Sequence, residues 1–144
     1  MKLTRRYRFA ASHRLHRPDW PEETNRLVYG KCNNPHGHGH NYELEVTVAG
    51  PVDPDSGRLA DLARLDALVD AEVIGAFDHA NLNQEVPAFA SCAPTTENLA
   101  LEIRDRLLRR WRESFPAGGP ELEKIKLRET KRNIFELFVH DHEN

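Results

Sequence analysis

The sequence predicts an α+β fold in which helices pack on one side of an antiparallel sheet. Two stretches with period-two alternation of apolar residues lie near each end, and two stretches with helical spacing lie between them. The expected order is therefore strand, strand, helix, helix, strand, strand (ββααββ), with hairpins joining the strands at both ends. A chain of 144 residues can bury a sizeable core, and we expect a single domain over residues 1–144.

Composition limits the classes of partner. A hydrophobic content of 39% and a charged content of 30% are typical of a globular protein. The formal charge of −3 gives no overall basic footprint for nucleic acid. No apolar run approaches the roughly 20 residues of a membrane helix, and the N-terminus lacks the apolar stretch of a signal peptide. We therefore expect a cytoplasmic protein with neither a membrane nor a nucleic-acid partner.

The first two strands are expected at residues 5–15 and 40–49. One face of the first carries a row of mostly apolar side chains, namely Tyr7, Phe9, Ala11, His13 and Leu15. In the second, four apolar residues alternate with polar ones: Tyr42, Leu44, Val46 and Val48. Residues 16–37 lack periodicity and are predicted as a long loop, and loops of that length are usually functional.

Helices are expected over residues 61–74 and from Thr95 or Thr96 to the Pro- and Gly-rich run at 116–120. Apolar residues at helical spacing form a stripe along each, and threonine is a favoured N-terminal cap. Residues 77–94 between the helices are predicted to be irregular. Two closing strands follow at 122–130 and 133–139. Four strands leave two open sheet edges, which an oligomer that joins those edges would resolve.

The run from Cys32 to Tyr42 carries the strongest chemical signal, because it holds one thiol and the imidazoles of His36, His38 and His40. Residues two apart on a strand project from one face, so His38 and His40 can aim at one point. His13 carries a third imidazole, on the apolar face of the first strand, and completes a candidate set of zinc ligands. Three protein ligands leave a fourth position open, as in catalytic zinc sites. His36 and His38 have the same spacing, so spacing alone does not select the pair.

Cys32 has two interpretations that spacing does not separate. It could be a fourth zinc ligand, which would close the site and make it structural. It could instead be a free thiolate beside the metal, able to take a proton from carbon, since a nearby cation favours the thiolate. A disulfide to Cys92 is possible in principle, but a cytosolic chain favours a catalytic or metal-linked role for one of the two cysteines.

Two further carboxylates stand out. Asp78 directly precedes His79, and a carboxylate close to an imidazole can orient it and raise its basicity. Adjacent residues on an extended chain point in opposite directions, so this pair need not touch. Glu129 is expected on the apolar face of its strand, where a buried carboxylate is costly unless paired. It could accept two parallel N–H bonds from a guanidine-like ring edge, or reach solvent or an arginine.

Five ordered motifs together resemble the 6-pyruvoyl-tetrahydropterin synthase family, which includes the 6-carboxy-tetrahydropterin synthases of queuosine biosynthesis. The resemblance covers nearly the whole chain. The matching segments are Phe9–Leu15, Gly30–Pro35 running into His38–Tyr42, Asp78–Asn83, Pro94–Asn98, and Glu129–Thr130.

The resemblance implies a role for each site residue. It implies that His13, His38 and His40 bind zinc and that Cys32 is the general base. Asp78 and His79 would form the second proton-transfer pair. Glu129 would hold the amino-pyrimidine edge of a pterin ring. Three residues at the start of the second helix would lie near the pocket: Thr95, Thr96 and Glu97.

The implied fold is the tunnelling fold, a four-stranded antiparallel sheet with two helices on one face. Three chains would close a twelve-stranded barrel, and two such trimers would form a homohexamer with active sites at the interfaces.

The implied activity is that of a carbon–oxygen lyase acting on 7,8-dihydroneopterin triphosphate. Zinc would bind the side-chain hydroxyls and acidify the adjacent C–H, acting as a Lewis acid. Triphosphate would leave by elimination, and internal redox rearrangement would yield 6-pyruvoyl-tetrahydropterin for tetrahydrobiopterin biosynthesis. No redox cofactor is required.

The sequence leaves two alternative functions open. The five-residue gap between Cys32 and His38 resembles the gap in the biopterin-pathway enzymes of the family, whereas the typical bacterial queuosine enzymes have a three-residue gap. The folate-linked branch of the family differs in another way, since it carries Glu in place of the thiol. A 6-carboxy-tetrahydropterin synthase would use the same substrate and release acetaldehyde as well. A non-catalytic module would have a structural zinc closed by Cys32. His36 departs from the family pattern, where Asn is common.

Overall fold

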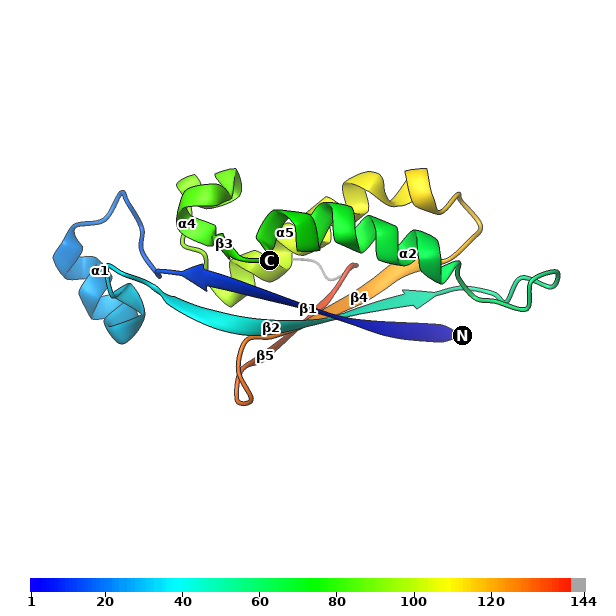
Figure 1. The fold of residues 1–144 in the computed structure, drawn as a ribbon, viewed down its shortest axis with the longest axis horizontal. Coiled ribbons are helices and arrows are strands. Elements are labelled where there is room, and N and C mark those ends of the chain that lie inside the picture. The colour runs from blue at the N-terminus through cyan, green and yellow to red at the C-terminus, as the bar shows by residue number, and fades with distance from the viewer. Residues whose placement is uncertain (141–144) are drawn as a thin grey trace.

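The computed structural model describes residues 1–140 and shows a five-stranded sheet with helices over one face (Figure 1). The strand order is β3-β1-β2-β4-β5. Four of the strands pair antiparallel: β1 (Lys2–His13), β2 (His38–Ala49), β4 (Glu121–Arg128) and β5 (Ile134–Phe138). The α+β class is confirmed.

The predicted sheet of four antiparallel strands is wrong in one respect. A fifth strand, β3 (Ala80–Asn81), joins the edge of β1 in parallel, with Ala11 opposite Ala80. Two residues are too few to leave a period-two pattern, so this strand had no signal in the sequence. The element order is therefore not simply strand, strand, helix, helix, strand, strand.

The region expected to be one long loop is also partly helical. It contains α1 (Glu22–Tyr29) and a 3₁₀ turn over Gly30–Asn33. The residue before α1 is Pro21, and no side chain caps the helix there. A short helix without a capping side chain lacks the local start signal on which sequence interpretation depends.

The two longer predicted helices are confirmed. The first comprises α2 (Leu62–Val69), a π-helical turn over Asp70–Ile74 and α3 (Gly75–Phe77). The second is α5 (Thr96–Ser114), and Thr95 is its cap, since the Thr95 Oγ1 accepts the Asn98 N–H at 3.1 Å. Short turns fill the segment between them, namely α4 (Leu82–Glu85) and a 3₁₀ turn over Pro87–Ala90. No helix within residues 1–140 is long and apolar enough to cross a membrane.

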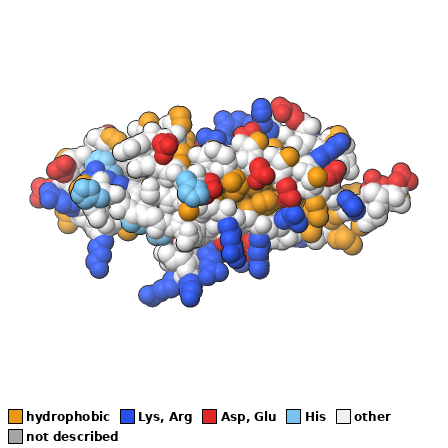
Figure 2. Space-filling view, in the orientation of Figure 1, with side chains coloured by type: hydrophobic (Ala, Val, Ile, Leu, Met, Phe, Trp, Pro, Cys, Tyr) orange, Lys and Arg blue, Asp and Glu red, His pale blue; other side chains and the backbone are white. Residues whose placement is uncertain are grey.

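The two faces of the sheet differ sharply. On the helix side, Phe9 stacks on Tyr42 with ring centroids 5.0 Å apart, and both are buried with residues of α2 and α5. On the opposite side, Arg6, Glu45 and Lys126 lie side by side across β1, β2 and β4. Figure 2 shows Lys and Arg side chains gathered along this underside. Alternation along β1 therefore assigns His13, four residues after Phe9, to the helix side.

A bidentate ion pair attaches α2 to β1. The Arg5 Nε and Nη2 donate to the two carboxylate oxygens of Asp66 at 2.7 and 2.9 Å, and the Tyr7 hydroxyl donates to Oδ1 at 2.8 Å. The Arg5 hydrogen bond holds the pKa of Asp66 below its usual value. Because that pKa is lowered by folding, the stabilisation is present above about pH 4 and is lost as the pH falls through the folded-state value.

We expect Asp66→Asn to lower the melting temperature by roughly 2–4 °C at pH 7, with a smaller difference near pH 3 and in high salt. The pair is over a third exposed, so solvent screening limits the effect. Asp19→Asn is the matched control, because Arg17 and Asp19 form the same bidentate pair between residues only two apart. Thermal unfolding of both variants across pH measures the difference, and an equal loss in both would contradict a role for Asp66 in attaching the helix.

Candidate metal centre

Four side chains from three strand ends converge on one point. The ligand atoms of His13, His38, His40 and Glu129 all lie within 4.8 Å of one another. The His13 Nε2 is 3.0 Å from the His38 Nε2, and the His40 Nε2 is 3.0 Å from the Glu129 Oε1. The convergence follows from strand register, since His13 pairs with His38 and Ala11 pairs with His40. Residues paired across antiparallel strands project from the same face.

A glycine makes the entry into β2 possible. Gly37 has φ +70°, and its N–H donates to the Asn34 carbonyl at 2.8 Å. A Cβ at this position would lie 3.1 Å from the His13 carbonyl oxygen. The left-handed conformation and the close approach both favour glycine. The turn therefore delivers His38 directly opposite His13.

Hydrogen bonding sets the tautomer of His13. This side chain is buried, and its Nδ1 lies 2.8 Å from the Pro94 carbonyl oxygen. A carbonyl only accepts, so Nδ1 carries the proton and the lone pair of Nε2 faces the other three groups. A metal-binding histidine usually has such a partner on its second nitrogen.

The clearest evidence that these residues suit a metal is the His40 Nε2. The atom is buried and has no hydrogen-bond partner among residues 1–140, since its contact with Glu129 lacks hydrogen-bond geometry. Buried polar atoms are rarely left unpaired without a functional reason. Burial lowers the pKa of both His13 and His40, which keeps them in the neutral form that binds a metal. The residues present therefore fit a metal ion.

Glu129, rather than Cys32, is the fourth member of this group. It lies just beyond the end of β4, and its second carboxylate oxygen accepts a hydrogen bond from the Thr96 Oγ1 at 2.8 Å. Cys32 is not among the four groups. The structure thus gives no support to the alternative in which Cys32 closes a structural zinc site.

Cys32 is a free, half-buried thiol on the 3₁₀ turn that precedes β2. Its carbonyl accepts the Leu15 N–H at 2.8 Å, which ties its backbone to the segment just past His13. Cys92 is also free, so the two cysteines form no disulfide.

Asp78 and His79 are in contact, although adjacency alone did not require it. The His79 Nδ1 is 3.1 Å from the Asp78 Oδ2, and His79 adopts φ +60°. The Ala10 N–H donates to the Asp78 Oδ1 at 2.9 Å, and this bond lowers the pKa of Asp78. An ionised carboxylate therefore orients an imidazole whose side chain is 83% exposed.

The structure does not bring His79 to the metal group within one chain. His79 borders a hollow of about 330 Å3 together with Ala10, Ser12 and Asn41. His40 borders the same hollow, but neither Asp78 nor His79 is among the four convergent groups.

Of the remaining expected site residues, one contacts the convergent group and the others do not. Thr96 is buried against Glu129, whereas Thr95 acts as a helix cap and Glu97 is exposed. His36 is exposed and outside the group of four convergent side chains, so His38 and His40 are the pair that could reach one ion together with His13. The Pro94 carbonyl was not singled out from the sequence, since a backbone oxygen leaves no compositional signal.

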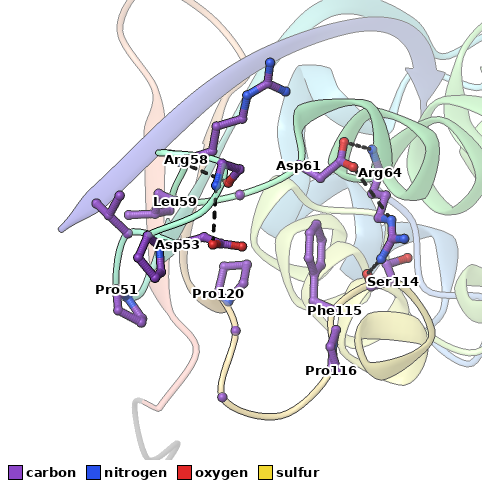
Figure 3. Close-up of a pocket in the computed structure, with 16 residues that line it drawn as sticks. Pro51, Asp53, Arg58, Leu59, Asp61, Arg64, Ser114, Phe115, Pro116 and Pro120 are labelled. Atoms are coloured by element: carbon purple, nitrogen blue, oxygen red, sulfur yellow. Dashed lines mark hydrogen bonds and ion pairs between the residues drawn. The ribbon is translucent and has the colours of Figure 1, made fainter.

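A separate hollow of about 610 Å3 lies between the β2–α2 loop and the segment that follows α5 (Figure 3). The Arg64 Nη1 donates to the Ser114 carbonyl at 3.5 Å on one side of it. Its lining includes no histidine and no cysteine. It therefore offers none of the chemistry of the metal group.

The comparisons with known proteins agree with this geometry. A family profile described as 6-pyruvoyl tetrahydropterin synthase matches residues 2–139. The chain is 44% identical over 132 residues to the 6-pyruvoyl tetrahydrobiopterin synthase of Poecilia reticulata, covering 92% of this chain and 86% of that one. It is 43% identical over 133 residues to the Homo sapiens protein of the same name, covering 92% and 88%.

A solved structure gives the same answer for the fold. The Caenorhabditis elegans 6-pyruvoyl tetrahydropterin synthase superposes with a TM-score of 0.86 at 37% identity, over 96% of this chain and 94% of that chain. A match over almost the full length, together with the convergent histidines, shows that the chain belongs to the 6-pyruvoyl tetrahydropterin synthase family.

Proposed function

We propose that this chain is a zinc-dependent lyase that converts 7,8-dihydroneopterin triphosphate to 6-pyruvoyl-tetrahydropterin. The observation that carries the proposal is the buried group of three imidazoles and one carboxylate in a chain 44% identical to a 6-pyruvoyl tetrahydrobiopterin synthase. Imidazole nitrogen suits zinc, and three histidine ligands leave the fourth position open, so the Glu129 carboxylate beside the ion remains free to bind substrate. A bound zinc ion would act as a Lewis acid toward the side-chain oxygens of the substrate.

The protein's own groups divide the remaining work. Glu129, held by Thr96, accepts N–H bonds from the amino-pyrimidine edge of the pterin. The Cys32 thiolate removes a proton from the substrate side chain, and His79, oriented by Asp78, moves the second proton. Elimination breaks the bond between carbon and the triphosphate oxygen, and the electron pair leaves with triphosphate.

Product analysis tests this function. Purified protein with added zinc is incubated with 7,8-dihydroneopterin triphosphate, and pterins, triphosphate and acetaldehyde are quantified. We expect 6-pyruvoyl-tetrahydropterin and one triphosphate per turnover, without acetaldehyde. Acetaldehyde in equal amount with a 6-carboxy product would instead assign the queuosine-type reaction. Metal analysis of the protein as purified tests zinc against other divalent ions.

In this proposal a second chain completes the site, because His79 lies outside the group of four convergent side chains within one chain. β1 pairs with β3 over only Ala11 and Ser12, and β5 is the other edge, so both edges can join further strands. A homohexamer of two barrel-forming trimers would bring the pair from one chain to the metal group of another. Mixing Cys32→Ala and His79→Ala subunits should then restore part of the activity that each variant lacks, and the absence of any recovery after subunit exchange would argue for sites within single chains.

Thr96→Val is expected to raise KM for the pterin substrate about tenfold while the melting temperature changes little. The valine keeps the shape of the buried side chain but removes the hydroxyl that donates to Glu129. A hydrogen bond to a charged group contributes roughly 1.5–3 kcal/mol, of which part is recovered by water or substrate. Steady-state kinetics measure the change. Thr95→Ser, which keeps the cap of α5, is the control and should leave KM unchanged.

A further inference from the structure

The turn that carries Cys32 is bonded at two points to Leu15, in the segment that follows β1. The Leu15 N–H donates to the Cys32 carbonyl at 2.8 Å, and the Asn33 Nδ2 donates to the Leu15 carbonyl at 2.8 Å. Both backbone groups of Leu15 are therefore bonded to consecutive residues of the turn. Because Leu15 is two residues beyond His13, the position of Cys32 is linked to that of the metal group.

Asn33 is the centre of this link. Its side chain is buried, and its amide also lies 3.2 Å from the His16 Nδ1. The Arg14 Nε donates to the Asn33 carbonyl at 2.9 Å, and Nη2 lies 3.4 Å from its side-chain oxygen. Backbone and side chain of one residue are thus bonded to the segment that follows His13.

Arg14 is itself fixed by a third segment. Its N–H donates to the Asn83 Oδ1 and its carbonyl accepts from the Asn83 Nδ2, each at 2.7 Å. Asn83 belongs to α4, which packs beside β3 and β1. The guanidinium that holds Asn33 therefore extends from a backbone with little freedom to shift.

We propose that Asn33 is a positioning residue that sets the distance between the Cys32 thiol and the metal-bound substrate. The inference rests on the proposed function for the role of Cys32. A thiol on an unattached 3₁₀ turn would sample many positions, and misplacement by about 1 Å can cost on the order of 100-fold in rate. Asn33 touches neither substrate nor metal in this account and acts only through the backbone of its neighbour.

The test compares two buried asparagines. Asn33→Ala removes the tie to Leu15, and Asn33→Asp keeps the shape but replaces the donor with a carboxylate oxygen. Asn25→Ala is the matched control, since Asn25 is fully buried and its side chain bonds to Arg17, Trp20 and Pro21 rather than to Leu15 or to the turn that carries Cys32. Each variant is measured for kcat, KM, metal content, oligomer size and melting temperature.

A second measurement does not depend on turnover. Iodoacetamide labelling of Cys32 is followed by mass spectrometry, with Cys92 in the same chain as an internal reference. We expect both Asn33 variants to lower kcat about 10- to 100-fold with KM and metal content within about threefold of the parent. We expect Cys32 in them to be labelled several-fold faster, whereas Asn25→Ala matches the parent in kcat and in labelling.

The outcomes separate the possibilities. Equal losses of kcat in the Asn33 and Asn25 variants, in proportion to their losses in melting temperature, would show a general structural role and overturn the proposal. Asn33 variants with the kcat and the Cys32 labelling rate of the parent would overturn it as well. If the Asn33 variants do not fold, Arg14→Lys is the substitute, because lysine lacks the planar guanidinium that contacts Asn33 at two atoms. It should lower kcat by a smaller factor and increase the labelling rate of Cys32. No change in either quantity overturns the proposal. If the parent protein does not turn over the pterin substrate, the proposed function fails, and the labelling rates still decide whether Asn33 holds the turn.

Discussion

His13→Ala is expected to remove the bound metal and to lower kcat/KM by about a thousandfold or more. His13 is buried, its Nδ1–H is bonded to the Pro94 carbonyl, and its Nε2 faces His38 at 3.0 Å. Removing one of three imidazoles would leave too few ligands for tight binding of the proposed zinc ion, and its Lewis-acid contribution would be lost with it. Metal content by mass spectrometry and steady-state kinetics measure the two effects.

His36→Ala is the control for this experiment. His36 lies only two residues from His38 but is exposed and outside the metal group. It should keep one metal ion per chain and a kcat/KM close to that of the parent. Because His13 is buried, His40→Ala at the partly exposed position serves as a second variant if His13→Ala is unstable. Full metal content in both ligand variants would contradict the assignment of the centre.

Cys32→Ala is expected to keep the metal while lowering kcat by roughly 100- to 10,000-fold, the usual contribution of a general base. The thiol is free and half-buried on the turn before β2, and it is not among the four convergent groups. Loss of a proton acceptor that does not bind the ion should leave metal content and melting temperature nearly unchanged. Kinetics, metal analysis and thermal unfolding together test this expectation.

Cys92→Ala provides the thiol control, because Cys92 is also free and its thiol donates to the Ala88 carbonyl at 3.3 Å rather than facing the metal group. It should retain both metal and turnover. Loss of metal from Cys32→Ala would instead indicate that the sulfur is a metal ligand, as in the alternative with a closed, structural zinc site. Retained turnover in Cys32→Ala would indicate that a group other than Cys32 removes the first proton.

Much of the fold could be predicted from local patterns. The alternation from Tyr7 to His13 and the capping threonine at residue 95 identified β1 and the start of α5, because one-sided burial and helix caps act over a few residues. β3 and α1 were missed for the opposite reason. Ala80–Asn81 forms a strand only because β1 lies beside it, and α1 begins without a capping side chain.

The site, like the fold, has features that local sequence patterns predict and features that depend on contacts between distant segments. The spacing of His38 and His40 predicts that they share a face, and the structure places them together with His13. Asp78 and His79 are in contact, and His79 has a positive φ; no pattern in the sequence predicts either feature. That Glu129 completes the group depends on the pairing of β4 with β2, a relation between distant segments.

The placement of His79 outside the group of four convergent side chains has a kinetic consequence. If the reacting groups come from different chains, an isolated subunit holds only part of the machinery, however well it is folded. Specific activity should then fall as the protein is diluted below the concentration at which subunits dissociate, and it should return with a lag when the protein is concentrated again. Supply of the pterin product would depend steeply on the amount of enzyme present.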